Sequence, residues 1–117
     1  MNLFTIIQEF NRRYDSLNDN LEKIIKNPQD SVVVYDYFNL CAEEYYFYSR
    51  GLIPSEIWRV WFSGMEEKFN CGIIQRHAIK EFTDKKNQYY GFSPFELGLL
   101  GTEKKTDKPR SFQSRVV

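Results

Sequence analysis

Paired glutamates are the first residues in this 117-residue chain that could do chemistry. Glu43-Glu44 and Glu66-Glu67 each bring two carboxyl groups together, and acid–base and di-iron sites are built from such groups. Neighbouring helical residues point about 100° apart, and neither pair has the Glu-x-x-His spacing of di-iron bundles, so neither forms such a centre alone. Glu44 differs because it falls on an apolar helix face, where a carboxyl group needs a partner. We predict that a tyrosine hydroxyl or an ion pair satisfies it.

The cysteines and the histidine suggest a thiol–imidazole pair or a zinc site, but the spacing does not favour either. A structural zinc ion takes four ligands, whereas Cys41, Cys71 and His77 are the only residues of these types. Six helical positions separate Cys71 from His77, which puts them on different faces. We interpret Cys41 as a small core residue and His77 as a surface residue, and we expect both thiols to be free.

Sequence motifs for other chemistry are absent. The chain has no glycine-rich phosphate loop, no HExxH, no CxxC and no Gly-x-Ser-x-Gly. We therefore expect no catalytic residues, no metal and no cofactor, and we do not expect an enzyme.

Basic and aromatic residues interleave in the last third of the chain, a pattern found in proteins that contact nucleic acid. This alternative would use Lys80, Lys85, Lys86, Lys104 and Lys105. Glu81 and Asp84 interrupt the run, so a solvated helix face is the favoured interpretation. The sixteen basic and sixteen acidic residues also balance, and no overall field attracts nucleic acid or a membrane surface.

The sequence pattern predicts that the elements that position these residues are helices. Apolar residues alternate at spacings of four and three over residues 2–26, and helical spacing recurs over 31–50. A third helix opens at Ile53-Pro54-Ser55-Glu56, and a fourth covers 73–86. Ser93-Pro94-Phe95-Glu96 indicates a short fifth helix that ends at Gly98 or Gly101. The expected fold is an all-α bundle of four main helices plus a short fifth helix, with a helical domain over 1–100 and a polar, basic tail over 101–117.

The helix over 31–50 is apolar almost all round. Its polar side chains, which fall in one narrow wedge, are Asp36, Asn39, Glu43 and Arg50. Such a helix is buried on more than one side, so it is either the central helix of the bundle or half of an oligomer interface. Gly51 is expected to end it in a left-handed conformation. The side chains predicted to share one core are Phe38, Cys41, Tyr45, Trp58, Trp61, Phe62 and Phe69.

Several apolar side chains lie away from that core face, and a lone bundle does not easily hide them all. The residues predicted to bind a partner are Tyr35, Tyr46, Phe47, Leu17 and Leu21. The primary hypothesis is a non-enzymatic protein–protein interaction module, an adaptor or an inhibitor of a larger assembly, acting as a homodimer or in a hetero-complex. Two alternatives remain: the nucleic-acid-associated protein described above, and a small-ligand sensor. The sensor would hold its ligand between the second and third helices, in a pocket rimmed by tyrosine hydroxyls and Glu44.

The segment from about 35 to 96 resembles a helical hairpin of bacterial protein families of unknown function. The residues that carry the likeness are Tyr37-Phe38-Asn39-Leu40, Arg50-Gly51-Leu52-Ile53 and Glu56-Ile57-Trp58 with Trp61. The resemblance implies an all-α fold and a bacterial or phage origin, and it transfers no active site. Several members carry transmembrane helices ahead of this domain. The present sequence has no basic leader and no run of about 18 apolar residues, so we expect a cytoplasmic protein without a membrane segment.

Overall fold

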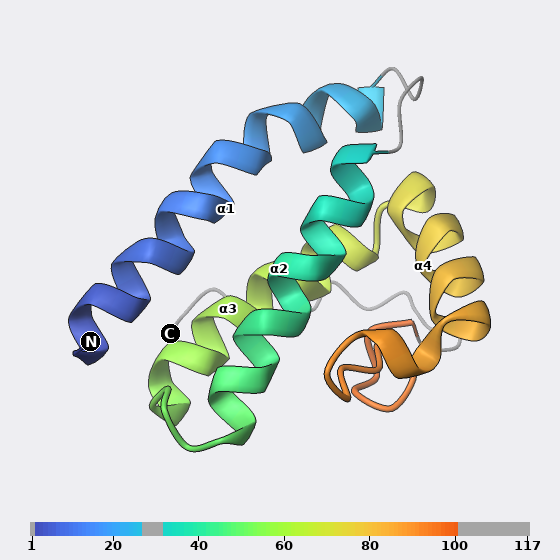
Figure 1. Ribbon diagram of the computed structural model, residues 1–117. Helices are drawn as coiled ribbons and strands as arrows, with labels where there is room; N and C mark the ends of the chain where they lie inside the picture. Colours follow the sequence, from blue (N-terminus) through green and yellow to red (C-terminus); the bar gives the residue numbers. More distant parts are fainter. Residues whose placement is uncertain (1, 27–31, 101–117) are drawn as a thin grey trace.

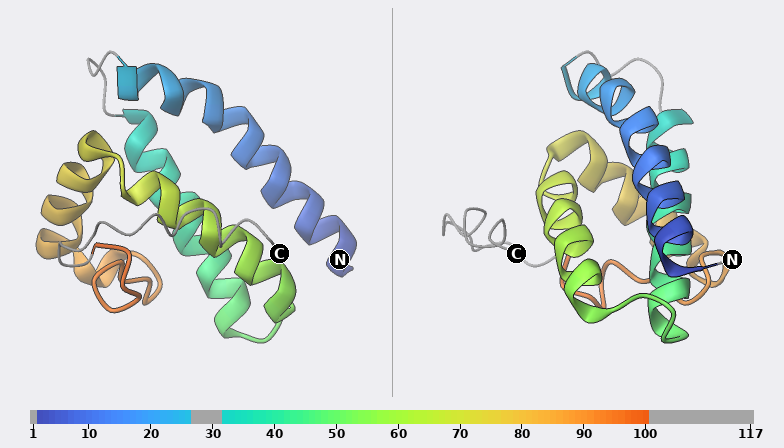
Figure 2. Two further views of the ribbon diagram at one scale, coloured as in Figure 1. Left: turned by 180° about the vertical axis from the view of Figure 1, so that it is seen from behind. Right: turned by 90° about the vertical axis from the view of Figure 1, so that its left-hand side faces the viewer.

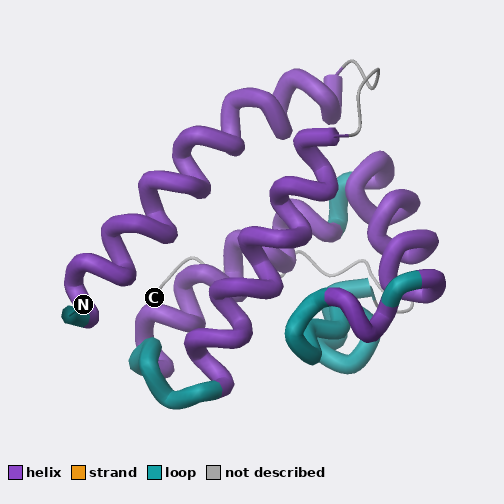
Figure 3. The backbone as a smooth tube through the Cα atoms, viewed as in Figure 1, coloured by secondary structure: helices purple, strands orange, loops and turns teal. Residues whose placement is uncertain are grey.

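The computed structural model describes residues 2–26 and 32–100, apart from the side chains of Lys26 and Lys86. Over these residues the chain forms four α-helices and no strand (Figures 1 and 3). The helices are α1 (Leu3–Lys26), α2 (Val32–Ser49), α3 (Ser55–Phe69) and α4 (Gly72–Asp84), and the 3₁₀ turn η1 (Lys86–Gln88) follows them. The all-α prediction is confirmed, with helix ends close to those expected. The predicted tail over 101–117 lies outside the described residues.

Helix α2 occupies the centre of the bundle. It runs antiparallel to α1, and α3 then returns along α2 (Figures 1 and 2). Residues of α2 contact α1, α3 and α4, whereas α4 packs on α2 and α3. This arrangement explains why α2 is apolar almost all round, and it is the first of the two alternatives that the sequence left open. None of the described helices is both long enough and apolar enough to cross a membrane.

Local sequence signals define the ends of the helices. The Asn2 Oδ1 atom accepts a hydrogen bond from the Thr5 backbone N–H at 2.9 Å, and so caps the start of α1. At the end of α2, Gly51 takes a φ of +79°. The N–H groups of Gly51 and Leu52 donate to the carbonyls of Tyr48 at 2.9 Å and Phe47 at 3.0 Å, the Schellman arrangement. The predicted termination at Gly51 is confirmed.

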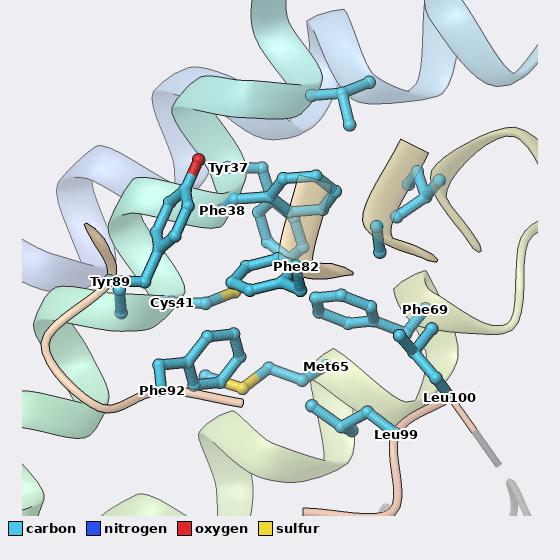
Figure 4. Packing of buried hydrophobic residues seen from close by; sticks show 14 of the residues in the cluster. Tyr37, Phe38, Cys41, Met65, Phe69, Phe82, Tyr89, Phe92, Leu99 and Leu100 are labelled. Atoms are coloured by element: carbon cyan, nitrogen blue, oxygen red, sulfur yellow. The ribbon is translucent and has the colours of Figure 1, made fainter. Parts of the chain in front are cut away.

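Aromatic rings form much of the core between α2, α3 and α4 (Figure 4). The Phe38 ring stacks on Phe69 with centroids 5.7 Å apart and meets the edge of Phe82 at 5.2 Å. Phe92, from the segment after α4, reaches both Phe69 at 6.3 Å and Phe82 at 5.7 Å. Residues far apart in the sequence thus share one apolar cluster, which stabilises the fold by removing their surface from water.

The short fifth helix predicted after Ser93 is not found. Residues 94–100 form successive turns instead. The Ser93 Oγ atom accepts from the Glu96 N–H at 3.2 Å, and Gly98 has a φ of +79°. The two signals are therefore real, but the left-handed Gly98 follows Ser93 by only five positions, and so short a segment does not repay the cost of helix nucleation. The segment instead closes the core, because Pro94, Leu99 and Leu100 are buried.

The predicted core needs one further correction. Phe38, Cys41 and Phe69 are buried, and Tyr45, Trp58 and Phe62 are partly buried against them. Trp61 is also half-buried, but it lies apart from this cluster. Its ring meets the edge of Phe10 of α1 at 5.5 Å. The apolar face of α3 is thus wider than the part of it that α2 and α4 cover, and Trp61 contacts α1 instead.

Candidate ligand site at Glu44

A cavity of about 200 Å³ lies where α1, α2 and α3 meet. Each helix presents one face to it, because the contributing residues recur at helical spacings of three, four or seven. The lining residues are Asn11 and Tyr14 of α1, Tyr37 and Glu44 of α2, and Val60, Trp61, Gly64 and Met65 of α3. We call this cavity the Glu44 pocket. The second and third helices form two of its walls, as the small-ligand alternative requires, and α1 forms a third wall.

The Glu44 carboxyl group is the unusual feature of this pocket. Its residue is only 6 % exposed, although buried glutamates normally have a hydrogen-bond or ion-pair partner. Among the described residues no side chain or backbone group donates a hydrogen bond to it. The tyrosine or ion-pair partner expected from the sequence is therefore not found in the described part of the chain. The group borders the cavity instead.

Burial dominates the electrostatics of this carboxyl group. Desolvation raises the pKa of Glu44 to about 8, with a smaller increase from the negative charge of Glu43. Arg13 acts in the opposite direction but only partly offsets the burial. The Arg13 guanidinium is held by Glu43, with Nη1–Oε1 at 2.7 Å and Nη2–Oε2 at 3.1 Å. Near neutral pH, Glu44 is therefore largely protonated.

The phenols and the thiol near Glu44 are neutral at neutral pH, unlike the Arg13–Glu43 ion pair. Burial raises the pKa of the Tyr37 phenol and of the Cys41 thiol well above their usual values. Burial also raises the pKa of Tyr14, although Lys68 opposes this. The Tyr14 hydroxyl donates to the Asn18 Oδ1 atom at 3.1 Å. The pocket is thus an aromatic and apolar site with one carboxyl group that can change charge.

Two α3 residues shape the walls of the Glu44 pocket. The Trp61 Nε1–H donates to Asn11 Oδ1 at 3.0 Å, which joins α3 to α1 beside the cavity. Gly64 lies in the middle of α3, and a Cβ atom added there would meet no atom within 4 Å. Glycine destabilises a helix interior, and no close approach of another group requires it here. Its missing side chain leaves the cavity open.

The arrangement suits binding better than catalysis. A buried carboxyl group with a raised pKa can serve as a general acid, but catalysis also needs a nucleophile or base beside the reacting atom. Apart from Glu44, the described residues that line the pocket carry phenols, an indole, a thioether, an amide and aliphatic side chains, and none of these is an activated nucleophile or base. A protonated carboxyl group donates and accepts one hydrogen bond, and its ionised form pairs with a cation. Both are means of holding a ligand.

The residues predicted to bind a partner mostly contact the rest of the chain. Tyr35 meets the His77 ring at 5.7 Å, and Tyr46 meets the Tyr90 ring at 5.5 Å. Phe47 packs on Phe10 of α1 with centroids 5.3 Å apart. The other two of the five predicted residues, Leu17 and Leu21, lie on α1.

Leu21 is fully buried in the core, so its assignment to a partner surface is wrong. The heptad spacing places Leu21 on the apolar face of α1, and residues of α2 and of the other helices cover that face around Leu21. Leu17 is half-buried beside an open polar groove between α1 and α2, which Arg12, Arg13, Asp36, Asn39 and Glu43 also line.

The lysines of the nucleic-acid alternative do not form a basic face within the described part of the chain. Lys80 is exposed and pairs with Asp84 at 3.3 Å, and Lys85 is exposed just after α4. Lys86 begins η1, and its side chain lies outside the description, as do Lys104 and Lys105. The structure thus brings no cluster of these five residues together within its described part.

Cys41 lies on α2, Cys71 directly precedes α4, and His77 lies within α4. Cys41 is buried and Cys71 is half-buried, and both thiols are free. The His77 Nδ1 atom lies 2.9 Å from the Ile73 carbonyl oxygen, within the same helix. Within residues 2–26 and 32–100, no group of three or more histidine, cysteine or acidic side chains could hold a metal ion.

Sequence reasoning missed most of the α1 and α3 walls of the pocket. Asn11 falls on the polar side of the α1 pattern, and Val60 falls off the aromatic stripe of α3. Gly64 was the available signal, because an unexplained glycine within a helical pattern often has a packing or functional reason. The small-ligand alternative names Glu44 and tyrosine hydroxyls as the rim of a pocket between the second and third helices, and Glu44, Tyr14 and Tyr37 line this cavity.

Comparison with known proteins finds no matching family model, no matching curated protein and no matching solved structure. Any function therefore has to follow from the residues of this chain.

Proposed function

We propose that this chain is a small-molecule-binding module whose ligand occupies the Glu44 pocket. One observation carries the proposal: a carboxyl group in a residue only 6 % exposed borders an open cavity and has no hydrogen-bond partner among the described residues. Desolvating such a group without a protein partner costs free energy, and the cavity leaves its oxygens accessible to a ligand. A ligand that hydrogen-bonds to Glu44 recovers part of that cost, and its apolar body gains from the rings around it.

The size of the cavity limits the ligand. An apolar cavity of about 150 Å³ in a protein core accepts benzene. The Glu44 pocket, at about 200 Å³, has room for one ring and a short polar arm. The proposed ligand is therefore a small molecule and not a peptide segment or a nucleotide.

The protein-interaction hypothesis has less support from the geometry. Tyr35, Tyr46 and Phe47, which were its central residues, make ring contacts within the chain. Binding of a small ligand needs no new surface, because the pocket is already formed by described residues of three helices.

Ring-sized probes test the proposal directly. Benzylamine and benzyl alcohol are titrated into ¹⁵N-labelled protein, and amide shifts are followed by NMR. We expect at least one probe to shift the signals of Trp61, Gly64 and Met65. Gly64→Leu should abolish this response, because its side chain enters the cavity. Glu66→Leu adds the same side chain on the exposed side of α3 and is the matched control. If neither probe shifts these signals, the proposed function is wrong.

A further inference from the structure

The charge of the ligand follows from what surrounds Glu44, provided that the pocket binds a ligand as proposed above. From α1 the nearby charged or titratable groups are Arg13 and Tyr14. From α2 they are Tyr37, Cys41 and Glu43. The lining residues of α3 carry no titratable group: Val60, Trp61, Gly64 and Met65.

An anionic ligand finds no uncommitted cation among the described residues around Glu44. Arg13 is the cation that acts on Glu44, and both ends of its guanidinium fork are bound to the Glu43 carboxylate at 2.7 and 3.1 Å. Lys68, further along α3, pairs with Glu22 at 2.8 Å. A ligand anion would also face Glu43 and, whenever it ionises, Glu44. The site therefore selects against negative charge.

A cation finds two kinds of partner here. Within residues 2–26 and 32–100 no salt bridge to Glu44 is found, so its two oxygens, once ionised, can accept from an ammonium group. The walls include the aromatic side chains of Tyr14, Tyr37 and Trp61. Aromatic faces attract cations most strongly in sites from which water is excluded. A neutral ligand uses one hydrogen bond but gains little from the charge distribution of the rings.

We infer that the ligand is a small organic cation, whose ammonium group pairs with Glu44 and whose apolar body lies against Trp61 and Tyr14. Binding of this cation is linked to release of the Glu44 proton. The pKa of Glu44, about 8, means that the carboxyl group is mostly protonated at pH 6 and about half ionised at pH 8. Affinity for the cation therefore rises across this range, whereas affinity for a neutral molecule of the same shape does not.

Three probes of nearly equal size and different charge test the inference: benzylamine as the cation, benzyl alcohol as the neutral form and benzoate as the anion. Their dissociation constants are measured by NMR titration at pH 6 and pH 8. We expect benzylamine to bind on the order of tenfold more tightly than benzyl alcohol at pH 8, and to gain at least that factor between pH 6 and pH 8. Benzoate should show no binding at either pH.

Glu44→Gln serves as the decisive variant because it keeps the shape of the protonated side chain. It should remove the preference for benzylamine over benzyl alcohol and the pH dependence of benzylamine binding. If benzyl alcohol or benzoate binds wild-type protein as tightly as benzylamine at pH 8, the inference is wrong and the pocket remains. If no probe shifts the pocket signals, the proposed function fails, and the inference fails with it. Far-UV circular dichroism of the variant checks that the helices are retained.

Discussion

Arg13 of α1 and Glu43 of α2 form a two-pronged ion pair directly beside the buried Glu44. Both partners are about one-third exposed, with side-chain accessibilities of 30 % and 35 %, so the pair contributes only modestly to stability. Its larger effect is on its neighbour. It holds the Arg13 guanidinium on Glu43 and so leaves the Glu44 carboxyl group without a hydrogen bond from that arginine.

Removal of Glu43 is therefore predicted to lower the pKa of Glu44. Glu43→Gln deletes a negative charge that raises this pKa and frees Arg13, which lowers it. Titration of the Glu44 side-chain carboxyl carbon by NMR should show a midpoint clearly below about 8, the value in the parent protein. Asp84→Asn, which breaks the distant pair with Lys80, is the control and should leave the midpoint unchanged. An unchanged midpoint in Glu43→Gln would mean that Arg13 does not act on Glu44.

The raised pKa of Glu44 also predicts that stability falls as the pH rises. An unfolded glutamate ionises near pH 4.3, whereas the folded one stays protonated up to about pH 8. Between these values the folded state binds the extra proton, so raising the pH favours unfolding, and above pH 8 the loss is complete. Glu44→Gln has no proton to lose there. Urea unfolding should show it more stable than the parent by on the order of 2–4 kcal/mol at pH 8, with a smaller difference at pH 5.

Glu66→Gln is the control for this titration, since Glu66 is exposed on α3. Its stability should follow that of the parent protein at both pH values. If the difference in unfolding free energy between Glu44→Gln and the parent protein is the same at pH 5 and pH 8, Glu44 is not a buried ionisable group.

Phe47 is predicted to stabilise the fold. It had been assigned from the sequence to a partner surface, but its ring meets Phe10 at 5.3 Å, and Phe10 is buried. Phe47→Glu should cost roughly 2–3 kcal/mol of unfolding free energy, because it replaces an aromatic contact by a carboxylate. Phe4→Glu, at a position 67 % exposed, should change stability little. If Phe47→Glu melts like the parent and only alters sedimentation, the side chain serves assembly after all.

The sequence predicted what depends on local pattern. Gly51 ends α2 as expected, because a left-handed residue after an apolar helix is a strong local signal. The all-round apolarity of α2 predicted burial on more than one side, either at the centre of the bundle or in an oligomer interface, and α2 lies at the centre of the described helices. The Ser93 and Gly98 signals are both present, but the fifth helix predicted from them is not found, because they enclose too few residues for a helix.

The site depended on tertiary geometry. Glu44 stood out because a carboxyl group on an apolar face is rare, but the sequence of α2 alone does not show that the described residues offer it no hydrogen-bond donor. That absence arises because Arg13, from another helix, is bound to Glu43. Trp61 similarly lies on the α3 stripe, and only the position of α1 decides that it borders a cavity rather than the main core.

Gly64 and Gly51 are predicted to respond in opposite directions to alanine. Gly64 lies within α3, where a Cβ atom would meet nothing within 4 Å, so alanine gains helix propensity without a clash. Gly64→Ala should raise the unfolding free energy by about 0.5–1 kcal/mol. Gly51 has a φ of +79°, which disfavours any side chain, so Gly51→Ala should lower it by about 1 kcal/mol. Thermal and urea unfolding of the two variants measure both effects. A destabilised Gly64→Ala would show that the space beside α3 is filled, which would remove the cavity on which the ligand site depends.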